Sequence, residues 1–341
     1  MYGLIRFFLF RFAPERAHRI ALSLLHFVCT LPLGASLIRS LYKTKSNERR
    51  VFGLSFDNPI GIAAGFDKNA EHVDVLTNLG FGFIEVGSVT AESCSGNPQP
   101  RLFRLPSDRG IINRMGLNNH GAAAAVARLE KVDRKTPIFV NIAKTPNPEL
   151  EGALGVEDYC TSARLVREVA DVVVVNISCP NSGDGKTFED PEALDDLLAG
   201  VREALTDQGP PMVVKVSPDL SDEHLKQVVK IANKYQVAGF TATNTTVNRD
   251  TLTATQARLE EIGRGGLSGR PLHERALETV RRLRAETDLP IIGVGGIMGP
   301  AEAQSFINAG ATLVQVYTGF IYQGPRLIKE VSSALPNDSN C

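Results

Sequence analysis

The chain has 341 residues, of which 43% are hydrophobic and 22% charged; this composition is typical of a soluble globular core, and the length accommodates one barrel of about 250 residues with an appendage, or two ordinary domains. Five scattered cysteines without CxxC or zinc-ligand spacing, and six histidines without an HExxH pattern, argue against a disulfide framework and a protein-bound metal and favour a reducing compartment. The net charge is −1, but residues 1–45 carry seven basic side chains and one acidic one, and no basic stripe follows that would track a nucleic-acid backbone.

The N-terminal segment, residues 1–42, is both apolar and basic. Hydrophobic residues at helical spacing predict two short amphipathic helices, the second over about residues 14–31. Its uncharged stretch before Pro32 covers only about 12 residues, fewer than the ~20 that span a bilayer. We therefore expect a two-helix extension that lies on an anionic membrane surface. A plain helical cap is the alternative, and a signal peptide fits poorly because Arg11 and Glu15 interrupt the apolar run.

Residues 43–341 alternate short apolar runs with helical patterns. After a polar linker over residues 43–50, eight apolar runs predict strands near residues 60–63, 83–86, 138–141, 172–176, 212–216, 239–243, 291–294 and 313–316. Strands alternating with helices predict a parallel sheet, and eight of them predict an α/β fold closed as a TIM (β/α)₈ barrel. A doubly wound sheet is the alternative, but no GxGxxG with a later acid follows the first strand.

The fourth apolar run carries the most chemical information. Four valines at residues 172–175 indicate a fully buried parallel strand, and polar side chains follow at Asn176, Cys179 and Asn181, where Pro180 excludes a helix. Packing along a strand with chemistry at its C-terminal end is the pattern by which a (β/α)₈ barrel builds an active site. A core strand followed by a turn, with Cys179 as a small buried side chain, is the alternative.

Polar residues and glycines also follow the other predicted strands. Lys215 lies within an otherwise apolar strand, and because a buried lysine needs a compensating anion, we expect it to contact a ligand. Glycines 295 and 296 after the seventh strand and Gly319 after the eighth predict a phosphate site on backbone N–H groups. Phosphate among strand-end amides suggests FMN, and a phosphosugar satisfies the same pattern.

Seven segments, in this order, resemble one family, dihydroorotate dehydrogenase. They are NPIGIAAGFDK (58–68), PRLFR (100–104), NRMGLNN (113–119), NISCPN (176–181), TNTT (243–246), GGLSGRP (265–271) and IIGVGG (291–296). The N-terminal RFAPERAH (11–18) and the helices around it resemble the membrane-associated, quinone-using type (class 2) of this family, which differs from the soluble types by such an extension.

The resemblance implies an enzyme that oxidises (S)-dihydroorotate to orotate in de novo pyrimidine (UMP) biosynthesis, with FMN as hydride acceptor and a membrane quinone as final electron acceptor. It implies a peripheral location at the cytoplasmic face of the cell membrane, with no nucleic acid and no obligate protein partner. The implied FMN ligands are Ala64, Gly65, Ser88, Asn141, Asn176, Lys215, Thr243, Gly269, Gly296, Tyr317 and Thr318. The implied substrate ligands are Lys68, Asn113, Arg114, Met115, Gly116, Leu117, Asn176, Asn181, Asn244 and Thr245. The implied catalytic residues are Cys179, as the base, and Lys215, and the candidates for the quinone site are Arg104 and Tyr317.

One residue departs from the quinone-using type. Its base position is usually serine, whereas Cys179 here matches the soluble types that use fumarate or NAD, and residues 182–187 lack the usual Gly-Leu-Arg. A soluble-type enzyme is therefore the alternative, although the chain has no iron–sulfur cysteine run of its own. A non-catalytic membrane-surface protein with a phosphate-binding barrel is a third hypothesis, disfavoured because so many buried polar groups are costly without a ligand. The N-terminal extension, as a whole structural module, favours the quinone.

Overall fold

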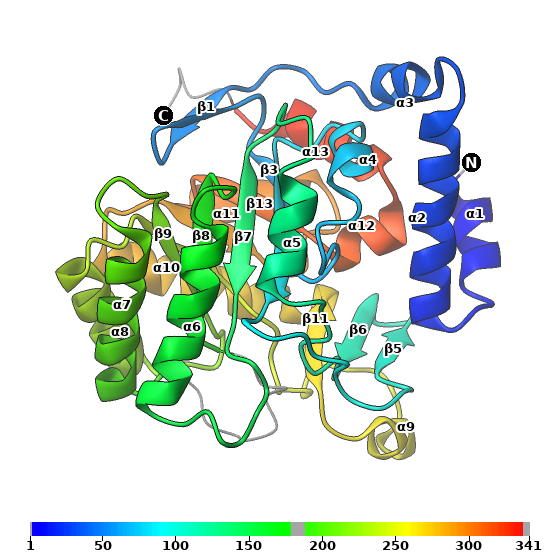
Figure 1. Ribbon diagram of the computed structural model, residues 1–341. Helices are drawn as coiled ribbons and strands as arrows, with labels where there is room; N and C mark the ends of the chain where they lie inside the picture. Colours follow the sequence, from blue (N-terminus) through cyan, green and yellow to red (C-terminus); the bar gives the residue numbers. More distant parts are fainter. Residues whose placement is uncertain (1, 179–187, 337–341) are drawn as a thin grey trace.

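Eight parallel strands close into a barrel at the centre of the computed structural model, which describes residues 2–178 and 188–336 (Figure 1). The strands are β3 (Ile60–Ile62), β4 (Phe83–Val89), β7 (Ile138–Ile142), β8 (Val172–Asn176), β9 (Met212–Val216), β10 (Gly239–Ala242), β12 (Ile291–Val294) and β13 (Leu313–Val316). Neighbours follow chain order, and β13 pairs back with β3. The predicted TIM barrel is confirmed, with all eight strands where the apolar runs place them.

Helices cover the outside of the barrel. They are α4 (Val73–Thr77), α5 (Ala122–Leu129), α6 (Ala153–Val166), α7 (Pro191–Leu205), α8 (Asp222–Lys234), α10 (His273–Glu286), α11 (Pro300–Asn308), α12 (Thr318–Gln323) and α13 (Arg326–Ala334), with the short 3₁₀ turn η1 (Arg270–Leu272) before α10. Two of these helices begin at an N-cap residue of the type that the sequence favours there. Asp190 accepts the N–H of Glu192 at the start of α7, and Ser221 accepts the N–H of His224 at the start of α8. Such caps satisfy N–H groups that have no partner within the helix.

A β-hairpin closes the N-terminal end of the barrel. Its strands are β1 (Arg49–Val51) and β2 (Leu54–Phe56). Phe56 packs edge-on against Phe83 and Phe139, with ring centroids 5.7 and 6.1 Å away, and all three rings are fully buried. Gly61 makes room for them, because a Cβ there would lie 2.4 Å from the Phe83 ring. The predicted linker over residues 43–50 is therefore wrong at its end, since β1 begins with two arginines and offers no apolar run to recognise.

A small antiparallel sheet lies at the end to which the barrel strands point (Figure 1). It contains β5 (Leu102–Leu105), β6 (Gly110–Asn113) and β11 (Gly266–Gly269), and α9 (Gln256–Ile262) precedes its last strand. Thr246, after β10, pairs with Leu267 of β11 and so joins this sheet to a barrel loop. The sheet consists of segments far apart in the chain, and the sequence pattern did not predict it.

Three helices, rather than the predicted two, form the N-terminal segment. They are α1 (Tyr2–Leu9), α2 (Pro14–Thr30) and α3 (Gly34–Tyr42). The two-helix prediction is wrong because Pro32, which cannot continue a helix, is followed by a further helix that begins at Gly34. Within residues 2–178 and 188–336, no helix alone is long and apolar enough to cross a membrane. The helices α2 and α3 reach the necessary length and apolar composition only as a pair, and the chain bends by 114° between them.

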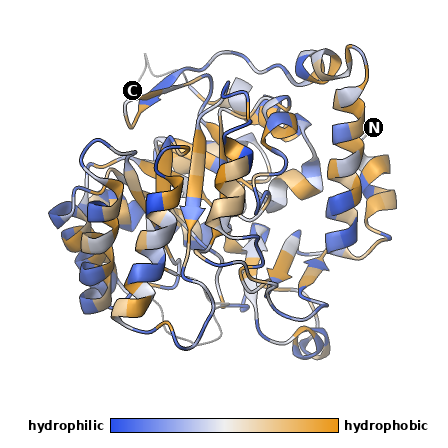
Figure 2. Ribbon diagram, in the orientation of Figure 1, coloured by the Kyte–Doolittle hydropathy of each residue, from blue (hydrophilic) through white to orange (hydrophobic). Residues whose placement is uncertain are grey.

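The outer side of these helices carries exposed apolar residues. Figure 2 shows hydrophobic residues along α1 and α2, which stand beside the barrel. The large hydrophobic side chains exposed on this segment are Leu4, Ile5, Phe7, Phe8, Phe12, Leu24, Phe27, Leu31, Leu33, Leu37 and Leu41. So many exposed apolar side chains on one segment indicate an interaction surface.

Candidate active site

A cavity of about 180 Å³ lies where the barrel strands end. Its wall combines the ends of the barrel strands with the small sheet, so that residues far apart in the chain meet in one place. The predicted site residues that line it are Ala64, Gly65, Lys68, Ser88, Asn113, Met115, Gly116, Leu117, Asn176, Lys215, Thr243, Asn244, Thr245, Gly269, Gly296, Tyr317 and Thr318. The structure thus gathers most of the predicted site residues at the C-terminal mouth of the barrel.

Five other predicted residues cannot be placed in this wall; the contacts of Asn141 and Arg104 are given below. The guanidinium of Arg114 lies over the ring of Phe103, 4.5 Å from its centroid, and donates a hydrogen bond to the Pro100 carbonyl. Arg114 thus braces the loop before β5 through its side chain, although its neighbours line the cavity. Cys179 and Asn181 lie outside the residues that the structure describes.

Lys215 is a buried cation in the cavity wall, and its counter-ion is Glu85 of β4. The ammonium nitrogen lies 3.6 Å from the carboxylate, and the two side chains are 8% and 0% exposed. An anion near Lys215 was expected from the cost of burying a charge, but sequence reasoning looked for it in a ligand and missed Glu85. Glu85 could have been found in the same way as Lys215, because it is a charged residue within an apolar run, at residues 83–86.

A chain of hydrogen bonds continues from Glu85 along the mouth of the barrel. The side-chain amide of Asn141, which does not line the cavity, donates to Glu85 at 2.8 Å. The Asn141 oxygen accepts from the Ser88 hydroxyl, and the Ser88 oxygen accepts from Asn176 at 3.3 Å. Asn176 in turn accepts from Asn244 at 3.2 Å. Three barrel strands, β4, β7 and β8, and the loop after β10 are therefore linked through polar side chains at the cavity.

Glycine backbone forms another part of the cavity wall. Gly269 and Gly296 have φ angles of +93° and +66°, and a Cβ at Gly296 would lie 2.7 Å from the Cβ of His273. Beside them, the hydroxyls of Ser268 and Thr318 share a hydrogen bond of 2.8 Å at the start of α12. Backbone N–H groups of this kind bind phosphate, while ammonium, amide and hydroxyl groups elsewhere in the wall match the polar edge of a flavin ring. The donor set fits FMN.

Lys68 reaches the cavity from the loop after β3. Its ammonium donates a hydrogen bond of 2.7 Å to the Gly65 carbonyl. Burial and, to a smaller extent, the positive charge of Arg101 lower the pKa of Lys68 to about 8, although the charges of Glu15 and Asp67 act in the opposite direction. Lys68 is therefore a cation at neutral pH and a neutral amine in moderately alkaline solution.

A second and larger cavity, of about 510 Å³, lies between the N-terminal helices and the barrel. Its wall is mostly apolar, and the residues that it shares with the first cavity are Gly65, Lys68, Leu102, Ile111, Met115 and Tyr317. The Tyr317 hydroxyl donates to the Gly65 carbonyl at 3.2 Å. Arg104 also lines this cavity, with its guanidinium 4.4 Å from the centroid of the Phe10 ring. Both residues predicted for the inner end of a quinone path thus lie in this wall, and Tyr317 lines both cavities.

Polar contacts fasten the N-terminal helices around the second cavity, and sequence reasoning missed them. Glu15 of α2 accepts two hydrogen bonds from the Arg101 guanidinium, at 3.1 and 3.0 Å. Farther along α2, ring nitrogens of His26 and His72 lie 2.8 Å apart. Burial lowers the pKa of His18, which lines the cavity, to about 4. His18 is therefore neutral at physiological pH and adds no charge to this apolar space.

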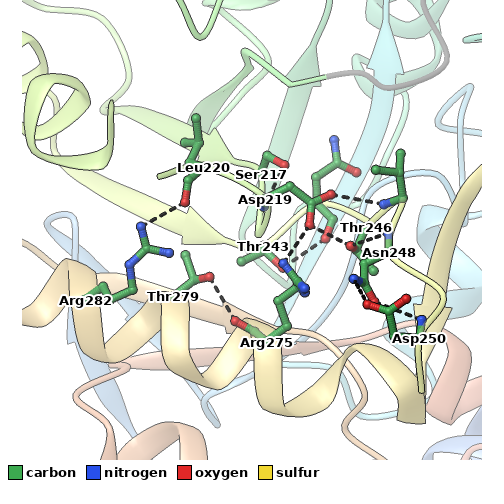
Figure 3. A network of polar contacts seen from close by, with 12 residues as sticks. Ser217, Asp219, Leu220, Thr243, Thr246, Asn248, Asp250, Arg275, Thr279 and Arg282 are labelled. Carbon is green, nitrogen blue, oxygen red and sulfur yellow. Dashed lines mark hydrogen bonds and ion pairs between the residues drawn. The ribbon is translucent and has the colours of Figure 1, made fainter. Parts of the chain in front are cut away.

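Figure 3 shows a network of polar contacts that joins the loop after β9 to the loop after β10. Asp219 accepts from the Thr246 hydroxyl at 2.6 Å and from the Val247 N–H at 3.0 Å, and it lies 3.3 Å from the Arg275 guanidinium. Because Thr246 directly follows residues 243–245, the network anchors the segment whose side chains line the cavity. Asp219 was not predicted, since nothing in its sequence context distinguishes it from other loop acids.

A closed (β/α)₈ barrel with a buried lysine and glycine backbone at its C-terminal mouth defines an α/β-barrel enzyme with a site for a phosphorylated ligand. The sequence of residues 46–338 matches the family model described as Dihydroorotate dehydrogenase. The chain belongs to the dihydroorotate dehydrogenase family.

Relatives of known name agree with this assignment. The chain is 45% identical over 341 residues to a protein of Nocardia farcinica named Dihydroorotate dehydrogenase (quinone), covering 98% of this chain and 92% of that one. A protein of the same name from Christiangramia forsetii is 43% identical, with 98% of both chains covered. The ligand-free DHODH of Eimeria tenella is 31% identical, with a TM-score of 0.83 over 96% of this chain and 95% of that one. The complex of the Eimeria tenella protein with ferulenol gives 0.79 at 31% identity, over 93% and 94% of the two chains.

Proposed function

We propose that this protein oxidises (S)-dihydroorotate to orotate with FMN in the barrel cavity and passes the electrons to a membrane quinone, in de novo pyrimidine biosynthesis. The observation that carries the proposal is the adjacency of two unlike cavities across Gly65 and Tyr317. One is walled by polar side chains and glycine backbone, as a substrate and a phosphorylated cofactor require. The other is apolar and lies under helices with an apolar outer side, as a lipid-soluble acceptor requires.

FMN, when bound, supplies the ring that accepts the hydride of dihydroorotate. We assign Lys215 and Asn176 to the polar edge of this ring, and Gly269, Gly296 and Thr318 to its phosphate. The predicted ligands Ala64, Gly65, Ser88, Asn141, Thr243 and Tyr317 complete the proposed cofactor site. Lys215 would oppose the negative charge that develops during reduction.

For the substrate, we assign the ammonium of Lys68 to the carboxylate of dihydroorotate. The amides of Asn113 and Asn244 offer both donors and acceptors to a cyclic ureide. Cys179, which lies outside the described residues, is the proposed base: its sulfur takes the proton from C5 while the hydride leaves C6. A thiol loses its proton more readily than a serine hydroxyl, which suits it to this task.

The second cavity is the proposed path of the quinone. In this proposal residues 1–42 bind the cytoplasmic face of the cell membrane peripherally and admit the quinone from the lipid, and residues 43–341 form the FMN-binding barrel. Arg104 and Tyr317 would meet the quinone at its inner end. Cys179 favours a second candidate, a soluble-type enzyme that uses fumarate or NAD, so the electron acceptor has to be measured.

Anaerobic mixing with dihydroorotate, followed by a panel of acceptors, tests the proposal. The purified parent protein should carry flavin that bleaches with dihydroorotate, and a long-chain quinone should reoxidise it faster than fumarate or NAD⁺. Cys179→Ala should keep its flavin but bleach at least about 100-fold more slowly, and Cys179→Ser should bleach with a pH profile shifted upward. A protein without flavin, or flavin that dihydroorotate does not bleach, rejects the dehydrogenase; fastest reoxidation by fumarate or NAD⁺ rejects the quinone.

A further inference from the structure

Glu85 is a buried carboxylate on which three strands converge. Its side chain is completely buried and, within the described parts of the chain, is not among those that line the cavity. One carboxylate oxygen accepts from Asn141 of β7 and lies near the ammonium of Lys215 of β9, and the other accepts from Gln315 of β13. A carboxylate offers only acceptors, so these three donors together offset the cost of burying the charge.

The acceptor-only character of Glu85 also fixes the direction of the hydrogen bonds beyond it. Asn141 has to present its nitrogen to the carboxylate, so its oxygen faces the Ser88 hydroxyl. The Ser88 hydrogen is thereby used, and the Ser88 oxygen accepts from Asn176, which accepts from Asn244. Every donor in this chain points toward Glu85. Because Ser88 and Asn176 line the cavity, the buried charge helps to decide which of their atoms remain for a ligand. Asn244 is oriented in addition by the Ser178 carbonyl, to which it donates, and by the Thr245 N–H, from which it accepts.

Gln315 is oriented in the same way on the other side of the carboxylate. Its nitrogen donates to Glu85, so its oxygen is turned away from the carboxylate. This Oε1 atom is buried and has no partner within the described residues, while Gln315 lines the cavity. It is therefore an acceptor left over for a donor on a bound molecule.

We propose that Glu85 is a positioning residue of the cofactor site: it holds the ammonium of Lys215, orients the polar chain through Asn141, and balances the positive charge next to the bound flavin. The proposal rests on the proposed function, because it concerns FMN in this cavity. Its consequence is electrostatic. With Glu85 beside it, Lys215 adds little net charge at the ring, so Glu85 keeps the flavin from holding electrons too strongly.

The reduction potential of the bound flavin tests this role, and its measurement does not require turnover. Glu85→Gln keeps the shape of the side chain but leaves Lys215 as an unpaired cation, which favours the reduced, anionic flavin. At a fixed potential near pH 6.5, the ratio of reduced to oxidised flavin should rise at least tenfold, which equals about 30 mV for a two-electron couple. Reductive titration against a reference dye gives this ratio.

Two control variants separate the charge from packing. Phe83→Leu alters the packing of the same strand, β4, at a buried residue that does not line the cavity; it changes no charge and should alter the ratio less than twofold. In a Lys215→Met background, adding Glu85→Gln should no longer raise the ratio, because the cation that it releases is absent.

Three outcomes overturn the proposal. They are a parent-like ratio in Glu85→Gln across pH 6–9, an unchanged shift in the Lys215→Met background, or an equal shift in Phe83→Leu. If Glu85→Gln does not fold, Glu85→Asp withdraws the charge by one methylene and should shift the ratio in the same direction, and a parent-like ratio there counts against the proposal equally. A parent protein that binds no FMN overturns the proposed function as well, whereas a failure confined to these variants overturns only the role of Glu85.

Discussion

At the scale of single residues, the two lysines of the site differ in their electrostatic partners. Lys215 is paired with a buried carboxylate at 3.6 Å, so its charge is fixed by the protein. The Lys68 ammonium donates to the backbone carbonyl of Gly65, and burial lowers its pKa to about 8. A cation whose compensation is incomplete is suited to take an anion from solution. In the proposed function, Lys215 therefore binds the cofactor and Lys68 binds the substrate.

The pKa of Lys68 leads to a prediction about orotate binding. Below pH 8 the side chain is an ammonium that attracts the carboxylate of orotate, and above pH 8 it is a neutral amine that does not. The dissociation constant of orotate should therefore rise about tenfold per pH unit above pH 8, as measured by the change in flavin absorbance on titration. In Lys68→Arg, whose charge persists to much higher pH, this rise should be absent. Equal pH dependence in both proteins would show that Lys68 is not the titrating group.

At the scale of elements, the continuity of the apolar pattern determined which strands could be predicted from the sequence. The barrel strands were predicted because each is a continuous apolar run, buried on both faces, with helical spacing between the runs. The hairpin β1–β2 and the small sheet over the mouth were not predicted, because polar residues or glycines interrupt the apolar pattern of their strands. The helix α3 was not predicted because a proline looks like the end of the helical segment.

The same reasoning separates the parts of the site. Residues at strand ends could be placed from the strand pattern, and family resemblance named their roles. Contacts that depend on how strands and loops meet could not be predicted: Glu85 under Lys215, Glu15 with Arg101, and Asp219 with Thr246 each join segments that are distant in the chain. No periodicity encodes such pairs, since they arise from barrel closure and from the docking of the N-terminal helices.

Loop anchoring gives a prediction at this scale. Asp219→Ala removes both acceptors of the Thr246–Val247 turn, so residues 243–245 lose their support (Figure 3). The free energy of unfolding should fall by about 2 kcal/mol, and the KM for dihydroorotate should rise about tenfold because Asn244 and Thr245 are displaced. Chemical denaturation and steady-state kinetics measure the two effects.

Asp222→Ala is the matched control for this variant. Asp222 also pairs with an arginine of α10, Arg282, but its side chain is 80% exposed, and exposed pairs contribute less than about 1 kcal/mol. We expect little change in either quantity. A parent-like KM in Asp219→Ala would mean that the small sheet alone holds the loop.

At the scale of the whole molecule, the N-terminal helices have two unlike sides. Their inner side encloses the 510 Å³ cavity next to the barrel, and their outer side exposes large apolar residues beside basic ones. Apolar side chains that remain exposed to water do not stabilise the fold. A lipid surface would bury them and would also attract the basic side chains. The second cavity would then open toward the layer in which a quinone dissolves.

The last prediction concerns negative charges introduced into this outer side. Phe27 and Leu37 are 61% and 58% exposed on α2 and α3, and burying each in a lipid surface is worth roughly 1.5–3 kcal/mol. Phe27→Glu combined with Leu37→Glu should lower partitioning onto anionic vesicles at least tenfold in sedimentation assays. Turnover with a long-chain quinone in those vesicles should fall in parallel, while turnover with a water-soluble acceptor stays at the parent level. Leu154→Glu, at a residue 60% exposed on α6, should change none of these; equal vesicle binding by the parent and the double variant would exclude this surface as the membrane contact.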